Sequence, residues 1–470
     1  MTRSHILISV GSIAACSLGA GMTLAQQGSS PEDGGPVLTF GISSTLSATD
    51  NYNLDPDNSE SAGLFDNRLS FGYANRRAND VLTLDLSGVL RANEPPGGSS
   101  MFDDRRARLG YDRQGVNSAL SFGADYSLAS VDSRDPFDDN LFFEDDPLDE
   151  TNLIQDRGDE EQIGARFRFE TGLDAPLGVI LEGRYRDRSF TDTTDPDLFD
   201  TETFNLSATT RFTLSPVTET RVVLRYEDYS AEDTPDTDRQ TASINLGLTQ
   251  ALSQVGTLDV LLGFQQIDTD ETIGGLRQSE TDTGLIGSID LTRELTRGTI
   301  GTSFNVSESV NGRTATWLVS RAMPLPRGAL EISLGVASDV DDSILPVGSL
   351  EFTHEMKRST LTASLERQVS TSSRSNELRT TRASLGYSYE INSLSDLSFS
   401  ANVAELDQAG GPTVNDTTRA DLRAVYSRDL TQDWRLSSGY EYRIRDEETV
   451  GSATSNRIFL TLERDFAIRP

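Results

Sequence analysis

The chain has 470 residues, 36% of them hydrophobic, and carries a net charge of −33. So large an acidic surplus excludes nucleic acid as a partner, because the phosphates would be repelled. Lys357 is the single lysine, so chemistry that needs a lysine amine has almost no candidate. The length suits either several soluble domains or one large barrel.

Residues 1–25 read as a cleaved signal peptide. Arg3 gives a positive start, residues 6–18 form a short apolar core, and residues 23–25 offer a small-residue cleavage site. An alternative is a lipoprotein-type site at Cys16, but small residues continue past it to the better site after Ala25. Cleavage after Ala25 would leave residues 26–36 as a short periplasmic segment and no cysteine for a disulfide.

From residue 37 onward, apolar residues fall on every second position in one run after another. In residues 381–403, for example, Leu385, Tyr387 and Tyr389 alternate with small or charged residues, and a second such run follows a short polar break. Alternation at period two predicts strands, and two runs across a short turn predict an antiparallel hairpin. Each strand therefore has one apolar face and one polar face.

The connections alternate between short and long. Short turns are predicted at residues 114–117, 174–177, 215–217, 296–298, 326–328 and 431–433. Longer acidic loops are predicted at residues 50–63, 93–103, 132–161, 191–201, 231–238, 269–279 and 408–416. This rhythm favours an all-β fold over residues 37–470, a single transmembrane up-and-down antiparallel β-barrel of about 22 strands (range about 18–22). A soluble β-sandwich or solenoid, with the apolar faces turned inward, is the alternative, but a sandwich rarely needs so many hairpins.

The last predicted strand, RIFLTLERDFAI at residues 457–468, places Phe466 and Ile468 at its final alternate positions. With the repeated hairpins, this strand resembles the end of a Gram-negative outer-membrane β-barrel of the porin-like kind. The resemblance implies a location in the outer membrane, contact with its lipid and lipopolysaccharide, and reading of Phe466 and Ile468 by the barrel-insertion machinery. The chain departs from the family pattern by continuing to Pro470.

A set of charged side chains is predicted to point into the lumen. These lumen or constriction candidates are Arg106, Arg108, Arg166, Arg168, Glu182, Arg184, Arg186, Arg423, Glu441 and Arg443. They are interpreted either as a constriction whose transverse field selects solutes or as ion pairs that stiffen the wall. The second interpretation is at least as well supported, because solvated pairs are common.

Aromatic side chains are predicted on the opposite, lipid-facing side, where they suit the girdles at the membrane interfaces. They are Tyr387, Tyr389, Tyr426, Trp434, Tyr440 and Tyr442. His354, the single histidine after the signal peptide, shares that face. With no second histidine and no cysteine, a catalytic or zinc-binding constellation cannot be assembled, and we expect no enzyme activity.

Loop 132–161 is dense in carboxylates, and Asp138, Asp139, Glu144, Asp145 and Asp146 are candidate ligands for a structural Ca²⁺. Their spacing does not match a twelve-residue calcium loop, so a solvated acidic loop is the default interpretation. A variant is that this loop, which also carries aromatic residues, folds into the mouth as a constriction. No other cofactor is expected.

The expected function is a water-filled pore for passive passage of small hydrophilic solutes. Export of a secreted polysaccharide is an alternative in the same class. A structural or adhesive surface barrel with cation-binding acidic loops is an alternative from another class. The pattern is neutral on the oligomeric state.

Overall fold

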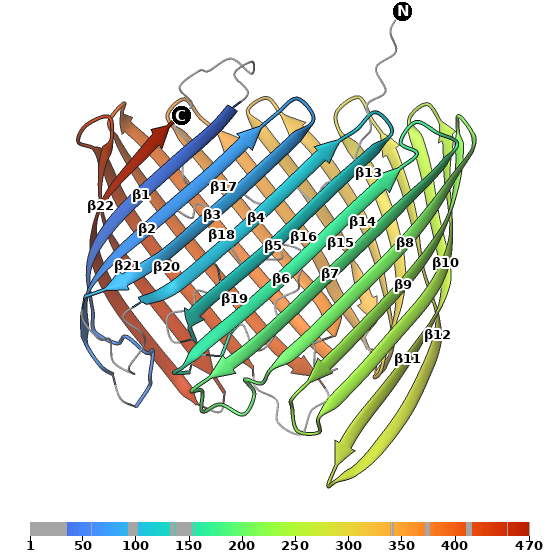
Figure 1. Ribbon diagram of the computed structural model, residues 1–470, viewed down its shortest axis with the longest axis horizontal. Coiled ribbons are helices and arrows are strands. Elements are labelled where there is room, and N and C mark those ends of the chain that lie inside the picture. The colour runs from blue at the N-terminus through green and yellow to red at the C-terminus, as the bar shows by residue number, and fades with distance from the viewer. Residues whose placement is uncertain are drawn as a thin grey trace, which may run out of the picture.

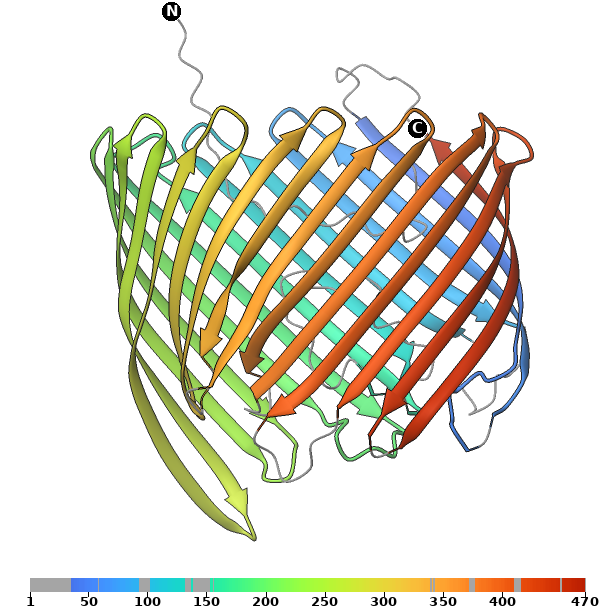
Figure 2. The same ribbon diagram turned by 180° about the vertical axis from the view of Figure 1, so that it is seen from behind.

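The computed structural model describes residues 35–469, except for residues 58, 93–101, 132–136, 138–152, 155, 339, 341–342, 372–376, 410–415 and 449. The described residues form one antiparallel sheet of 22 strands, each paired with its neighbours in the chain (Figures 1 and 2). Pairing of the first strand with the last closes the sheet. The predicted all-β barrel and its strand number are confirmed. Among the described residues, no helix is long and apolar enough to cross a membrane.

The strands are numbered in chain order. Their bounds are β1 (Gly35–Thr49), β2 (Ala62–Arg76), β3 (Asp80–Arg91), β4 (Phe102–Gln114), β5 (Ser118–Ser130), β6 (Asp159–Thr171), β7 (Leu177–Thr191), β8 (Thr201–Ser215), β9 (Thr218–Ala231), β10 (Thr237–Ser253), β11 (Gly256–Ile273), β12 (Leu276–Glu294), β13 (Thr299–Ser309), β14 (Gly312–Leu325), β15 (Gly328–Ser338), β16 (Ile344–Glu355), β17 (Ser359–Thr371), β18 (Glu377–Asn392), β19 (Ser395–Ala409), β20 (Thr417–Asp429), β21 (Trp434–Glu447) and β22 (Gly451–Ile468).

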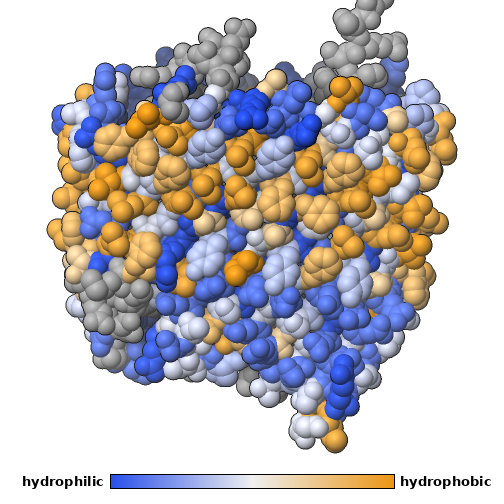
Figure 3. All heavy atoms as spheres, in the orientation of Figure 1, coloured by the Kyte–Doolittle hydropathy of each residue, from blue (hydrophilic) through white to orange (hydrophobic). Residues whose placement is uncertain are grey.

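The apolar residues of the alternating pattern cover the outside of the barrel. Leu246, Leu262 and Leu334 on β10, β11 and β15 are 64%, 61% and 67% exposed. Figure 3 shows hydrophobic residues as a band across the visible face of the barrel, between a narrow hydrophilic rim and a broad hydrophilic end. A band of this kind suits lipid rather than water, and closure of the sheet pairs the strand backbones internally, as a bilayer requires.

The two ends of the barrel differ as predicted for the turns and loops. The short turns lie at the end where β22 finishes, at the top of Figure 1, and most of the longer connections lie at the other end. We assign the end with short turns to the periplasm and the other to the cell exterior, because outer-membrane barrels have short periplasmic turns and longer external loops.

The prediction of a long loop at residues 269–279 is wrong. β11 continues to Ile273 and β12 begins at Leu276, so only Gly274 and Gly275 form the turn, with φ of 61° and 80°. Positive φ at both positions suits a two-residue hairpin turn, and glycine adopts it without strain. The acidic composition suggested a loop, but the hairpin protrudes beyond the barrel wall (Figure 2), where charged strand residues remain hydrated.

Candidate functional site

The inward face of the sheet forms the lumen wall. The register places all ten predicted lumen residues at inward positions, opposite the apolar outward set. They do not form one constriction but are spread over three parts of the wall, on β4, on β6–β7 and on β20–β21.

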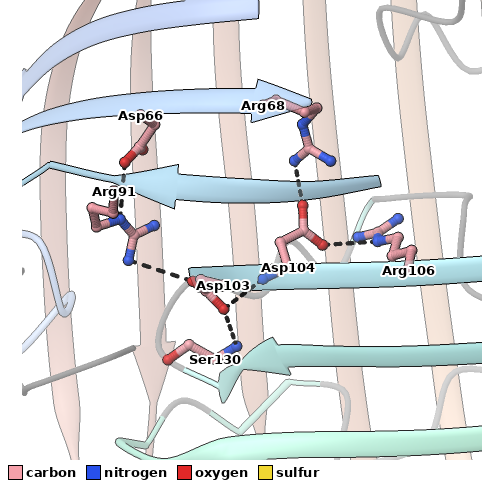
Figure 4. A network of polar contacts seen from close by, with 7 residues as sticks. All are labelled: Asp66, Arg68, Arg91, Asp103, Asp104, Arg106 and Ser130. Atoms are coloured by element: carbon pink, nitrogen blue, oxygen red, sulfur yellow. Dashed lines mark hydrogen bonds and ion pairs between the residues drawn. The ribbon is translucent and has the colours of Figure 1, made fainter. Parts of the chain in front are cut away.

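One part is an ion-pair network at the external ends of β2–β5 (Figure 4). Arg91 contacts the carboxylates of Asp66 and Asp103 at 2.9 and 3.4 Å, and Asp103 accepts a hydrogen bond of 3.1 Å from the backbone N–H of Ser130. Arg106 pairs with Asp104 at 2.8 Å. Arg106 therefore belongs to a wall-stiffening network, which also fixes the last residue of β5 where the β5–β6 connection leaves the sheet.

That connection reaches a distant part of the wall. Leu153 is 2% exposed and packs against the inward side chains of Leu378 on β18 and Leu406 on β19. Arg419 on β20 donates hydrogen bonds of 3.2 and 2.5 Å from Nε and Nη2 to the backbone oxygen of Leu153. β5 and β6 are not neighbours of β18–β20 in the sheet, so Leu153 lies against a part of the wall distant from the strands that the connection joins.

Asp156 holds the same connection to the β7–β8 loop. Its carboxylate accepts hydrogen bonds from the Thr194 hydroxyl and the Asp195 backbone N–H, both at 2.7 Å, and from the Thr194 backbone N–H. Burial raises the pKa of Asp156, but these hydrogen bonds outweigh it, and the pKa lies below its ordinary value of 3.8. Of the predicted variant, in which segment 132–161 folds into the mouth as a constriction, the structure describes the docking of Leu153 and Asp156; residues 132–136, 138–152 and 155 lie outside the described residues, so the constriction stays a prediction.

The predicted residues on β20 and β21 line another part of the wall. Arg423 stacks on the inward ring of Phe459 at 4.9 Å, and Glu441 lies between Arg443 and Arg457 at 3.7 and 3.6 Å. Arg443 also donates a hydrogen bond of 3.3 Å to the backbone oxygen of Tyr52, from the β1–β2 loop. On β4, Arg108 lies opposite Asp85 and Asp125 in the register. These contacts favour a stiffened wall at both places.

A cavity of about 720 Å³ lies along the wall of β6–β11, and Arg166, Arg168, Glu182 and Arg184 line it. Arg186 occupies the next inward position on β7. The cavity follows two adjacent rows of inward residues that run across β6–β10. The rows are Arg168–Glu182–Ser207–Arg225–Ser243 and Arg166–Arg184–Asn205–Glu227–Thr241. Long charged side chains on β6, β7 and β9 thus alternate with short ones on β8 and β10, which leaves a hollow between them.

The wall of β11–β17 has a different charge. At the inward positions of these strands, the described residues include carboxylates but no arginine. Glu331 and Glu351 lie directly opposite each other on β15 and β16, and Glu366 follows on β17. The five arginines of β11–β17 take outward positions: Arg277, Arg293, Arg313, Arg321 and Arg367. The lumen therefore has an arginine-containing side and an acidic side.

The residues that were predicted to face the lipid lie at outward positions of the sheet. The six aromatic residues and His354 occupy outward register positions, and the His354 ring stacks on Phe352 at 6.1 Å. Phe466 and Ile468 end the outward row of β22 and are 40% and 52% exposed. Their reading by the insertion machinery stays a prediction.

The proposed calcium ligands Asp138, Asp139, Glu144, Asp145 and Asp146 lie outside the described residues, as do the signal peptide and Cys16. In the described part of the chain, no group of three or more potential metal-ligating side chains is found. A calcium role therefore stays an expectation.

Several residues of the lumen were not singled out from the sequence. Arg225 and Arg239 line the cavity, and alternation with Leu224, Tyr226 and the outward residues of β10 already marks both as inward. Leu378 and Leu406 carry a subtler signal, since each is a large apolar residue on the polar side of its strand.

A closed antiparallel barrel with an apolar exterior and a charged lumen defines a Gram-negative outer-membrane β-barrel, and this protein is one. Solved outer-membrane proteins share the fold. The ferric-catecholate import receptor Fiu of Escherichia coli aligns with a TM-score of 0.57 and 10% identity, over 93% of this chain and 82% of that chain. The siderophore receptor PirA of Acinetobacter baumannii gives 0.56 and 8%, over 92% and 81%. The FrpB iron transporter of Neisseria meningitidis gives 0.55 and 9%, over 91% and 81%.

Neither a family model nor a curated protein matches the sequence. At the identities found, the solved structures establish the fold alone, which is the barrel fold of outer-membrane transporters. The predicted class of protein and its location in the outer membrane are confirmed.

Proposed function

We propose that the protein is a channel for small hydrophilic solutes across the outer membrane. The observation that carries this proposal is the charged inner wall, where arginines and carboxylates occupy inward positions on most strands while apolar residues face outward. Such a wall stabilises water and polar solutes within a membrane-spanning barrel.

Part of the chain lies inside the external end of this channel. In the described part of the connection between β5 and β6, Leu153 lies against the inner wall of β18–β20, where Arg419 and Leu406 hold it. Solutes entering from outside then pass beside this segment and along the arginine-containing wall of β6–β10, which adjoins the acidic wall of β11–β17. Neighbouring stretches of the lumen wall that differ in charge orient polar solutes and favour some over others.

Substrate-specific uptake is a second candidate. It is favoured by the same segment across the mouth, together with the likeness to solved import receptors and transporters. In that case the segment would close the channel until a particular solute binds. Both candidates are transport roles without catalysis, and the lipid-facing position of His354 suits neither proton transfer nor metal binding in the lumen.

The test is single-channel current from the protein purified from the outer membrane of a Gram-negative host and inserted in a planar bilayer. Discrete, stable steps in potassium chloride support the open channel. Folded, inserted protein without steps would reject the open channel, and uptake assays in cells would then test the substrate-specific candidate. The proposed membrane partners are the lipid and lipopolysaccharide around the apolar band and the insertion machinery at the last strand.

A further inference from the structure

The hairpin formed by the outer parts of β11 and β12 extends beyond the rest of the barrel at the external end (Figures 1 and 2). β12 is paired with β11 from Leu276 to Arg293, which is almost its whole length. With β13 it is paired only from Gly287 onward. Among the described residues, no strand pairs with residues 276–286 of β12 on the β13 side.

The two edges of the hairpin differ. On the β11 side, β10 is paired up to Asp270, and the Thr272 backbone N–H donates a hydrogen bond of 2.6 Å to the Pro235 backbone oxygen. On the β12 side, Glu308 on β13 lies against Gly284, where a Cβ would be 2.2 Å from the Glu308 carboxylate. The open edge therefore consists of residues 276–283, all of which are exposed except the partly exposed Asp282.

An open edge of this length is a template for a further strand. Every second residue of an edge strand turns both its backbone N–H and its backbone C=O to the open side. In the part of the chain that the structure describes, no backbone group from outside the hairpin bonds to residues 276–283. An extended segment lying beside β12 would satisfy these groups, as in the addition of a peptide strand to a sheet edge.

The outer face of the hairpin is already occupied by its own polar contacts. Asp270 pairs with Arg277 at 2.6 Å and accepts a hydrogen bond from the Ser279 hydroxyl. Asp268 accepts a hydrogen bond of 2.8 Å from the Thr281 hydroxyl. These contacts join β11 to β12 and stiffen the hairpin beyond the wall.

The opposite face carries three carboxylates, those of Glu271, Glu280 and Asp282. Within the described residues, none of the three forms a hydrogen bond or an ion pair, and one carboxylate oxygen of Asp282 is buried without a partner. At the tip of the hairpin, Ile273 and Leu276 are 49% and 72% exposed. This face therefore combines uncompensated negative charge with an exposed apolar tip.

The charge of this face decides what kind of strand fits. A second copy of the hairpin would bring the same carboxylates together, and like charges on neighbouring strands repel each other. Basic side chains at alternate positions of an added strand would instead lie beside Glu280 and Asp282, the two carboxylates on β12 itself. An apolar residue at one end of that strand would cover Leu276.

We propose that the open edge of β12, residues 276–283, is a docking site for an extended segment of a partner protein that carries basic residues at alternate positions. The segment adds a strand to the hairpin. Backbone hydrogen bonds supply affinity, and the carboxylates select the charge of the partner. Because the hairpin lies at the external end of the barrel, the partner reaches it from outside the cell.

The test is binding of a short labelled peptide in which lysine alternates with valine, measured by fluorescence anisotropy with the full protein in detergent. We expect saturable binding. A peptide with glutamate in place of lysine should not bind, because like charges then lie side by side. A peptide with the same lysines but proline in place of valine should bind at least about tenfold more weakly, because proline lacks the N–H that pairing requires.

Two double variants test the position of the site. Glu280→Gln, Asp282→Asn removes the carboxylates beside the added strand and should weaken binding of the lysine–valine peptide about fivefold. Asp57→Asn, Glu60→Gln is the matched control, because it removes the same charge from exposed residues of the β1–β2 loop, and should bind as the wild type does. A circular dichroism spectrum of β-sheet from each variant shows that it is folded.

Hydrogen exchange followed by mass spectrometry identifies the edge directly, since residues 276–283 should become protected when the lysine–valine peptide binds. Absence of saturable binding would overturn the proposal, and so would equal binding of the proline peptide, which would reflect attraction of charge alone. Equal weakening in the two double variants would also reject the site. Protection of residues 276–283 that rises with protein concentration in the absence of peptide would assign the edge to a second copy instead.

Discussion

Arg419 donates two hydrogen bonds to the backbone oxygen of Leu153, a residue 266 positions earlier in the chain. The contact joins the β5–β6 connection to the wall at β20, and Arg419 is only 6% exposed there. A buried guanidinium bound to a backbone oxygen contributes more than a surface pair, because loss of the acceptor would leave a desolvated charge. The contact therefore fixes Leu153 against the inner wall of the barrel.

Leu153 is also held by apolar packing against Leu406, and Leu406→Ala removes this packing. Truncation of a buried leucine costs about 2 kcal/mol or more, and here the loss falls on the docking of Leu153. We expect a larger single-channel current than in the wild type. Leu422→Ala on the neighbouring strand removes a lipid-facing leucine that is 50% exposed and should leave the current unchanged. Equal currents from Leu406→Ala and the wild type would show that the segment does not limit passage.

The anchor at Asp156 predicts a pH dependence. Because hydrogen bonds from the β7–β8 loop lower the pKa of Asp156 when the segment is docked, the anchor is complete above the ordinary pKa of 3.8. It weakens as the pH falls below 3.8 through the lowered pKa, when the carboxyl group takes up a proton. We expect the wild-type current to rise in this acidic range, and Asp156→Ala to show the higher current already at pH 7.

Asp174→Ala is the control for this experiment, since Asp174 lies in the periplasmic β6–β7 turn, at the opposite end of the barrel. Its current should match that of the wild type across the pH range. If Asp156→Ala and the wild type conduct equally at pH 7, Asp156 is not an anchor of the mouth.

A variant of the terminal strand β22 should affect insertion into the outer membrane without affecting folding in detergent. Phe466→Ala should lower the amount of protein in the outer membrane severalfold, because it removes an aromatic residue from the final outward row. Refolding of the purified variant in detergent should proceed as in the wild type. Phe399→Ala, which removes an outward aromatic residue from β19, should not lower the amount in the membrane. Similar amounts of both variants would argue against a signal at Phe466.

Alternation at period two was sufficient to predict the class of fold, because each strand meets lipid on one side and water on the other. It placed Arg166, Arg184 and Arg423 inward and Tyr389 and Tyr440 outward, and the register agrees. Composition was a poorer guide at residues 269–279, where acidic residues continue a hairpin beyond the wall. The docking of Leu153 was beyond reach of local pattern, since it depends on contacts between segments more than 200 residues apart.

Two adjacent residues of β13 can be used to test which face of the sheet meets lipid. Phe304 faces outward and is 42% exposed, whereas Ser303 faces the lumen. An arginine on the lipid face near the middle of the membrane costs about 2–4 kcal/mol, so Phe304→Arg should lower the free energy of unfolding in lipid vesicles by about this amount. Ser303→Arg places the same charge in a hydrated lumen beside Asp290 on β12 and should cost about 0.5 kcal/mol or less. Urea unfolding of the two variants measures the difference. Equal costs, or a larger cost at Ser303, would mean that the apolar band does not face lipid.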